Sequence, residues 1–194
     1  MQLSIQNCGA VILAGGRSRR MGTCKALLKI HGETMLTRLA GQLELFDERL
    51  LSANDPGLSG EVSFPAVADV FQGAGPLGGL HAALSAVKKE ALFCVPCDLP
   101  NFTSEMPMLL MEYFPEKTDA FVCRDGSGRI HPLCGVYTKQ ALPVIEKQLV
   151  CGEYRMTDLL RKLRCVYFDT AAFLSDHVFY NINTQDEFAG CHVG

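Results

Sequence analysis

Glycines and basic side chains gather near the start of the chain, in a pattern suited to binding phosphate. Gly15 and Gly16 follow a short apolar run at 10–13, and four basic residues come soon after them. These four are Arg17, Arg19, Arg20 and Lys25. A buried strand that ends in a glycine turn can present backbone N–H groups to a phosphate chain. The stretch therefore predicts a site for a nucleoside triphosphate.

The best-known phosphate-binding motif does not describe this loop. A P-loop has two glycines separated by four residues, and the second glycine is followed directly by Lys and then Ser or Thr. Here Gly16 and Gly22 lie further apart, and Cys24 directly precedes Lys25. A surface loop with solvated basic residues is the alternative, but four such side chains in so short a stretch favour phosphate binding.

A second glycine-rich stretch, at 73–78, reads Gly-Ala-Gly-Pro-Leu-Gly and matches the dinucleotide pattern G-x-G-x-x-G by letter. It does not directly follow the first expected strand, and Pro76 occupies an internal position, so a dinucleotide site is not expected. We expect a loop here in which Gly78 contacts a base or ribose. A plain helix entry is the alternative.

Asp98 follows the most apolar run of the chain, 91–95. A carboxylate at the end of a buried strand is well placed to hold Mg²⁺ against phosphate oxygens. The alternative is a turn or helix cap, because a proline and an asparagine follow closely. Cys94 and Cys97 have redox-pair spacing, but a redox pair usually opens a helix and Cys94 falls within the strand. We interpret both as structural thiols.

The elements that would position these residues alternate between strand and helix. Apolar runs bounded by turn residues predict strands at 10–13, 49–53, 64–68, 91–95, 120–123, 131–137 and 165–169. Helical spacing predicts helices at 34–45, 80–88, 104–114, 141–150 and 156–163, and an extended piece at 179–182 precedes a last helix at 185–189. The expected fold is α/β: a three-layer, doubly wound, mostly parallel sheet with helices on both faces. We expect one domain over 1–194.

Polar residues follow four of the expected strands. Gly15 and Gly16 come after the first, Asn54 after the second, Asp69 after the third and Asp98 after the fourth. In parallel sheets, ligands bind outside the carboxyl ends of the strands. We therefore expect these four loops to converge on one crevice.

The second half of the chain carries fewer signals. His131 is interpreted as the first residue of a strand, and Arg155 lies in the polar segment 152–155. Asn181 and Asn183 alternate in a strand-like pattern, so both could face one side. They could bind a ligand or cap the following helix, and the pattern does not choose between these roles.

Composition narrows the functional classes. Net charge is −3, with 48% hydrophobic and 20% charged residues, so we expect no nucleic-acid partner. We expect no signal peptide and no membrane span, because the first residues lack the basic and apolar regions of a signal and no apolar stretch approaches ~20 residues. Nine cysteines without an export signal are expected to be reduced thiols in a cytoplasmic protein.

Taken together, the motifs resemble a known family. The segment 13–22 followed by Lys25 is similar to the signature of nucleotidyltransferases that activate sugars, isoprenoid precursors and pterins. Further motifs resemble the molybdenum cofactor guanylyltransferase family, also called molybdopterin-guanine dinucleotide biosynthesis protein A. These are Gly-Pro-Leu-Gly-Gly at 75–79, Pro-Cys-Asp-Leu-Pro at 96–100, His-Pro at 131–132, the segment 152–155 and Asn-Ile-Asn-Thr at 181–184.

The resemblance implies a Rossmann-like nucleotidyltransferase fold and the transfer of GMP from GTP to molybdenum-bound molybdopterin, with release of pyrophosphate. It also implies roles for individual residues. Those expected at the guanine nucleotide are Leu13, Ala14, Gly15, Gly16, Asn54 and Asp69. Lys25 and Arg20 would hold the phosphates, Asp98 would bind Mg²⁺, and the pterin would contact His131, Arg155, Asn181 and Asn183. A GTP-binding companion protein and recipient molybdoenzymes are the implied partners.

One position departs from the family pattern, and several functions stay open. Many members have Asp directly before the lysine, where this chain has Cys24, which leaves the orientation of Lys25 undecided. A cytidylyltransferase acting on the same pterin, or a nucleotidyltransferase for another phosphorylated acceptor, fits the same motifs. A nucleotide-binding regulatory module without catalysis is the alternative from another class, and a thiol redox protein rests only on Cys94 and Cys97.

Overall fold

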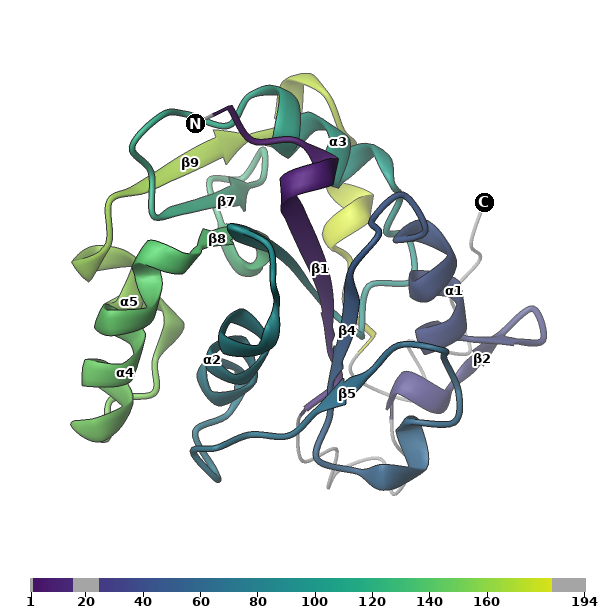
Figure 1. Ribbon diagram of the computed structural model, residues 1–194. Helices are drawn as coiled ribbons and strands as arrows, with labels where there is room; N and C mark the ends of the chain where they lie inside the picture. Colours follow the sequence, from purple (N-terminus) through teal and green to yellow (C-terminus); the bar gives the residue numbers. More distant parts are fainter. Residues whose placement is uncertain (1, 16–24, 183–194) are drawn as a thin grey trace.

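A seven-stranded sheet forms the centre of the computed structural model, which describes residues 2–15 and 25–182. Its strand order is β5-β4-β1-β6-β8-β7-β9, and β8 runs antiparallel to its neighbours while the other pairs are parallel. The strands are β1 (Cys8–Leu13), β4 (Arg49–Ser52), β5 (Ala66–Val67), β6 (Ala91–Pro96), β7 (Ala120–Arg124), β8 (Ile130–Thr138) and β9 (Cys165–Asp169). The expected mostly parallel α/β sheet is confirmed (Figure 1).

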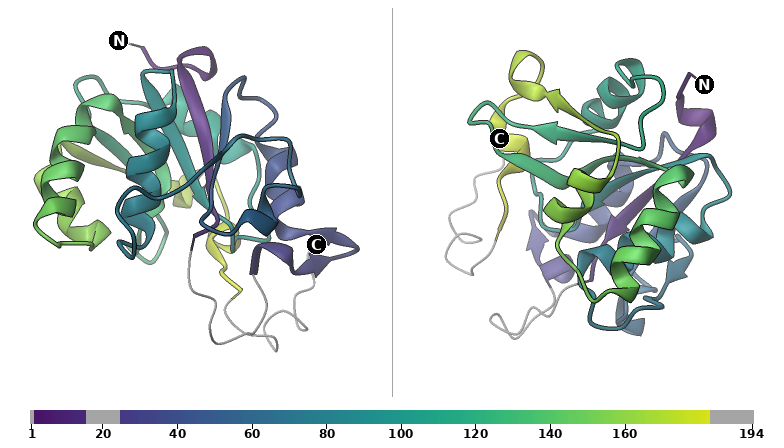
Figure 2. Two further views of the ribbon diagram at one scale, coloured as in Figure 1. Left: turned by 60° about the horizontal axis from the view of Figure 1, so that its bottom comes forward. Right: turned by 90° about the vertical axis from the view of Figure 1, so that its left-hand side faces the viewer.

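Helices cover both faces of this sheet (Figures 1 and 2). One apolar cluster joins α1 and α3 to the sheet, and a second joins α2, α4 and α5 to the opposite face. The helices are α1 (Met35–Gln42), α2 (Pro76–Ala86), α3 (Glu105–Glu112), α4 (Leu142–Val150) and α5 (Met156–Lys162). The three-layer arrangement predicted from the sequence is therefore confirmed.

The central strand β1 explains why both faces need cover. All six of its residues are buried. Ala10 and Ile12 belong to the α1–α3 cluster, whereas Val11 and Leu13 belong to the opposite one. Successive side chains of a strand point to opposite faces, so a continuously apolar strand must be covered on both.

A short hairpin precedes α1. Strands β2 (Lys29–Ile30) and β3 (Glu33–Thr34) pair antiparallel around His31 and Gly32, both of which have positive φ. Two positive-φ residues are what a tight two-residue hairpin turn requires. Thr34 then caps α1, because its hydroxyl accepts a hydrogen bond from the Thr37 N–H at 3.1 Å.

Two local predictions were wrong. Helix α2 begins at Pro76 and not at residue 80, because Gly75 with φ 62° ends the loop and proline suits the first helical position. The extended piece expected at 179–182 was wrong at its start, because Phe179 is the last residue of a 3₁₀ turn, η6 (Asp176–Phe179). Tyr180 has extended backbone, but 180–182 form no regular strand. The Ser175 hydroxyl accepts a hydrogen bond from the His177 N–H and so favours the turn. The last predicted helix, 185–189, lies outside the described residues.

Among the described residues, no helix is both long and apolar enough to cross a membrane.

Candidate functional site

The carboxyl ends of four parallel strands lie at one edge of the sheet (Figure 1). Leu13 is in register with Ser52 on one side and with Pro96 on the other. Main-chain pairing continues past these ends, since the Ala14 N–H donates to Ser52 O and the Cys97 N–H donates to Leu13 O. The loops that follow β1, β4, β5 and β6 therefore start side by side, as predicted.

Lys25 and Asp98 meet at this edge. The Lys25 Nζ lies 3.8 Å from the Asp98 Oδ2, and the side chains are 20% and 21% exposed. The Asp98 Oδ1 is buried and has no hydrogen-bond partner within 2–15 and 25–182. Burial raises the pKa of the Asp98 carboxyl, while the charge of Lys25 lowers it in part. A half-buried carboxylate with an unused oxygen is suited to receive a cation or a donor from a ligand.

A hydrogen bond from a distant segment also fixes the main chain at Asp98. Its carbonyl oxygen accepts a hydrogen bond from the Ile182 N–H at 3.2 Å. Ile182 is fully buried and packs in a small cluster with Ile30 and Met35. Asn181, predicted at the acceptor site, directly precedes Ile182 and is half-buried. The contact therefore joins the Asp98 loop, the hairpin and the Asn181 segment.

Asn54 and Asp69 form a reciprocal pair. The Asn54 Nδ2 donates to the Asp69 Oδ2 at 2.8 Å, and the Asp69 N–H donates to the Asn54 Oδ1 at 3.0 Å. These two bonds tie the loop after β4 to the loop after β5. Asn54 is exposed and Asp69 is half-buried, so both residues remain accessible to a ligand.

The first turn of α2 packs closely against the same loops. A Cβ on Gly79 would lie 2.5 Å from the Ser52 Oγ and 3.6 Å from the Asp69 Oδ1. A Cβ on Gly78 would lie 3.1 Å from the Phe71 carbonyl oxygen. These glycines belong to the helix and not to a loop, and their lack of a side chain lets α2 approach the β4 and β5 ends.

His131, near the start of β8, is engaged by neighbours. Its Nε2 lies 2.8 Å from the Asp125 Oδ2, its ring stacks on Phe179 at 4.0 Å, and its side chain is only 11% exposed. Neither Asp125 nor Phe179 was part of the predicted site. The Asp-Gly-Ser-Gly turn at 125–128 was the available signal for Asp125, while nothing local marked Phe179.

The remaining predicted residues are placed only in part. Arg155 is exposed and immediately precedes α5, where its carbonyl oxygen accepts a hydrogen bond from the Gln148 Nε2. Leu13 and Ala14 are buried at the end of β1, and Gly15 is exposed. Gly16, Arg20 and Asn183 lie outside the described residues.

The Cys94 thiol is fully buried in β6. Burial raises its pKa well above the usual value, so it stays protonated and unreactive near neutral pH. Its environment is that of a structural thiol. Within the described residues, no group of three or more His, Cys, Asp or Glu could hold a metal ion alone.

Comparison with known proteins identifies the family. The family model for the MobA-like NTP transferase domain matches residues 10–166. The chain belongs to this family. It is therefore a nucleotidyltransferase, and the carboxyl edge of its sheet, with Lys25 and Asp98, is the candidate active site.

Relatives and a solved structure match nearly the whole chain. The protein named "Probable molybdenum cofactor guanylyltransferase" from Pelotomaculum thermopropionicum is 36% identical over 188 residues, covering 94% of this chain and 91% of that protein. A protein of the same name from Geobacillus sp. strain WCH70 is 34% identical, covering 92% of this chain and 94% of its own length. The molybdopterin-guanine dinucleotide biosynthesis protein A of Archaeoglobus fulgidus is 23% identical, with a TM-score of 0.81 over 93% of this chain and 95% of that one, which shows a shared fold.

Proposed function

We propose that this nucleotidyltransferase transfers GMP from GTP to molybdopterin that carries molybdenum, and releases pyrophosphate. The meeting of Lys25 and Asp98 at the carboxyl edge supports the transfer chemistry. The names of the relatives from Pelotomaculum and Geobacillus support the choice of guanine nucleotide and of the molybdenum cofactor.

The reaction requires little acid–base catalysis from the protein. An oxygen of the acceptor's terminal phosphate forms a bond to the α-phosphorus of GTP, and the bond from that phosphorus to the bridging oxygen of the β-phosphate breaks. The acceptor phosphate is already anionic at neutral pH, so no general base is needed. Catalysis then consists of aligning two phosphates and neutralising their charge.

Lys25 supplies one of the positive charges in this proposal, and its 3.8 Å contact with Asp98 holds its Nζ at the carboxyl edge. Backbone N–H groups at Gly15 and Gly16 would receive the phosphate chain, and Arg20 would add a second charge. Leu13 and Ala14, at the end of β1, would contact the nucleotide. The roles of Gly16 and Arg20 are inferred from the sequence alone.

Asp98 has the features expected of a Mg²⁺ ligand. Its buried Oδ1 has no partner in the described part of the chain, and a carboxylate oxygen is the kind of ligand that Mg²⁺ prefers. A single protein carboxylate is enough, because Mg²⁺ in such sites takes its other ligands from phosphates and water. When bound, the ion would neutralise charge on the phosphates. The desolvated Asp98 carboxylate would hold it, with its main chain fixed by Ile182.

The remaining residues divide between the two substrates. Asn54 and Asp69, locked together, would contact the base and ribose, with Gly78 letting the nucleotide approach α2. Asn181, next to the Asp98 contact, and the exposed Arg155 would contact the acceptor, with Asn183 beside them in sequence. The product would pass to molybdoenzymes, with a GTP-binding protein as companion, in the cytoplasm.

A nucleotide panel tests the proposal. The purified protein is incubated with Mg²⁺, a molybdopterin-containing acceptor and each of GTP, CTP, ATP and UTP, and pyrophosphate is measured. We expect release with GTP that depends on both acceptor and Mg²⁺. Release with CTP alone would make the chain a cytidylyltransferase. Nucleotide binding without pyrophosphate release in any mixture would contradict catalysis on this acceptor.

A further inference from the structure

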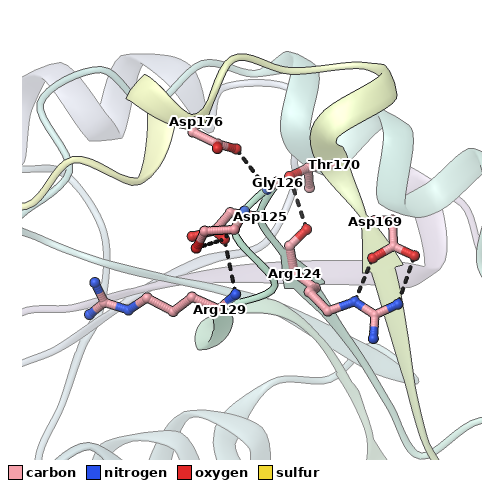
Figure 3. A network of polar contacts seen from close by, with 8 residues as sticks. Arg124, Asp125, Gly126, Arg129, Asp169, Thr170 and Asp176 are labelled. Atoms are coloured by element: carbon pink, nitrogen blue, oxygen red, sulfur yellow. Dashed lines mark hydrogen bonds and ion pairs between the residues drawn. The ribbon is translucent and has the colours of Figure 1, made fainter.

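The turn between β7 and β8 is organised by one carboxylate (Figure 3). The Asp125 Oδ1 accepts hydrogen bonds from the Ser127 N–H, the Ser127 hydroxyl and the Arg129 N–H, at 2.7–3.0 Å. Its other oxygen, Oδ2, lies 2.8 Å from the His131 Nε2. The turn is therefore a rigid platform whose carboxylate also fixes the His131 ring.

The β7–β8 turn and His131 contact η6 at two places. The His131 ring stacks on the Phe179 ring at 4.0 Å with an interplanar angle of 13°. The Gly126 N–H donates to the Asp176 Oδ1 at 2.9 Å, as Figure 3 shows. Phe179 is 6% exposed, so the stacked pair is largely shielded from water.

The segment 176–182 also contacts the loop after β6, which carries Asp98. The Asn101 Nδ2 donates to the His177 carbonyl oxygen at 3.2 Å. Three residues beyond Phe179, the Ile182 N–H donates to the Asp98 carbonyl oxygen, also at 3.2 Å. A continuous set of contacts thus runs from the β7–β8 turn through η6 to the main chain of Asp98.

We propose that His131, locked by Asp125, is a positioning residue that holds Phe179 and thereby fixes the main chain of Asp98. Its Nε2 and one ring face are already occupied, which leaves little of it for direct contact with a substrate. The proposal rests on the proposed function only for the role of Asp98. The contacts themselves stand independently of it.

Two variants break the link at different places. Phe179→Leu removes the stacked ring. His131→Phe keeps an aromatic ring against Phe179 and removes only the bond to Asp125, so it is the milder change. Phe121→Leu is the matched control, since Phe121 is a buried ring of β7 that packs on Phe114 and Phe168 and takes no part in the contacts to Asp98.

Hydrogen exchange gives a readout independent of activity. In both link variants, we expect the amides of 176–182 to exchange about 2–10-fold faster than in the wild type. This is the range expected for the loss of an aromatic contact in Phe179→Leu and of one hydrogen bond in His131→Phe. Phe121→Leu should leave these amides unchanged. Unchanged exchange in both link variants would overturn the proposal. If Phe179→Leu does not fold, unchanged exchange in His131→Phe alone would overturn it.

Kinetics separate positioning from plain stability. We expect kcat to fall roughly 10–100-fold in Phe179→Leu, with the KM for GTP within about twofold, because a displaced group costs rate more than binding. The Mg²⁺ concentration for half-maximal rate should rise in parallel, and Phe121→Leu should behave as the wild type. If the wild type itself releases no pyrophosphate, the proposed function fails. If the wild type is active and the link variants match Phe121→Leu, the positioning role fails.

Discussion

The Lys25 Nζ lies 3.8 Å from the Asp98 Oδ2, although the two residues are 73 positions apart in the chain. Lys25 opens the short 3₁₀ turn η2 (Lys25–Leu27), and Asp98 follows β6. The two opposite charges partly compensate for each other's loss of water. Their side chains nevertheless keep about a fifth of their surface exposed, at 20% and 21%, so this contact can be exchanged for a phosphate and a cation.

Removing either charge should abolish most activity and spare the fold. We expect Lys25→Ala and Asp98→Asn to lower kcat/KM for GTP by roughly 10²–10³, the usual cost of losing one charged group aimed at a reacting centre. The circular dichroism spectrum and melting temperature should stay close to those of the wild type. The rate of pyrophosphate release is the measurement.

The control for these variants is Arg161→Ala. Arg161 is 78% exposed and pairs with Asp158 one turn earlier on α5, so its loss should leave the rate unchanged. Asp98→Asn with near wild-type turnover in Mg²⁺ would contradict the role proposed for Asp98.

The close approach of α2 to the sheet makes Gly79 sensitive to a single methyl group. A Cβ there would lie 2.5 Å from the Oγ of the buried Ser52 and 3.5 Å from the Leu13 Cδ2. We expect Gly79→Ala to destabilise the protein by about 1–3 kcal/mol, as overpacking does. It should also weaken GTP binding, because the Asp69 loop lies beside it. Urea unfolding and nucleotide titration are the measurements.

Gly41→Ala gives the matched comparison. Gly41 lies inside α1, and a Cβ there would meet nothing within 4 Å. Alanine should stabilise that helix by about 0.5–1 kcal/mol. If both alanine variants shift the urea midpoint in the same direction, close packing at Gly79 is not the determining factor.

The reciprocal bonds between Asn54 and Asp69 predict a rescue. Asn54→Asp places two carboxylates where an amide now donates to Asp69 at 2.8 Å, and the repulsion should spread the two loops. We expect the KM for GTP to rise about tenfold, equivalent to ~1.4 kcal/mol for a charge-assisted hydrogen bond. The change in kcat should be small.

The double variant Asn54→Asp/Asp69→Asn exchanges the amide and the carboxylate, and so restores an amide–carboxylate pair. It should recover most of the lost affinity. A double variant no better than Asn54→Asp alone would show that the pairing does not set the affinity, and that the Asp69 carboxylate is needed for its own contact with the nucleotide.

The sequence predicts the carboxyl edge well, because strand ends can be found locally. Apolar runs ending in Gly15, Asn54, Asp69 and Asp98 identify four loops, and parallel pairing then brings them together. Helix α2 was expected too late because its glycines favour a loop, whereas Pro76 at the first helical position decides the outcome.

Contacts between distant segments leave no local signal. His131 and Phe179 are 48 positions apart, and Asp98 and Ile182 are 84 apart. Periodicity reports which residues face the core and not which partner they meet. The family resemblance implied that His131 contacts the acceptor, and its position between Asp125 and Phe179 became visible only in the structure.

The Asp119–Arg164 pair predicts how stability responds to acid. The Asp119 Oδ2 accepts hydrogen bonds from the Arg164 N–H and Nε, both at 3.0 Å, and its Oδ1 accepts another from the guanidinium. The hydrogen bonds from the Arg164 side chain are the main reason that the pKa of the Asp119 carboxyl lies below its usual value. A depressed pKa in the folded state means that the stabilisation is complete above about pH 4–5, and is lost as the pH falls through the folded value.

Asp119→Asn should therefore lower the free energy of unfolding at pH 7 by roughly 1–3 kcal/mol, the range for a hydrogen-bonded charged group. The gap to the wild type should narrow as the pH falls from about 5 toward 2, because protonated Asp119 no longer attracts Arg164. Asp158→Asn, which removes the pair with the 78% exposed Arg161, should change stability by less than about 1 kcal/mol at any pH. Urea unfolding across this pH range measures all three proteins, and a gap that stays constant would show that the charge of Asp119 is not what stabilises the fold.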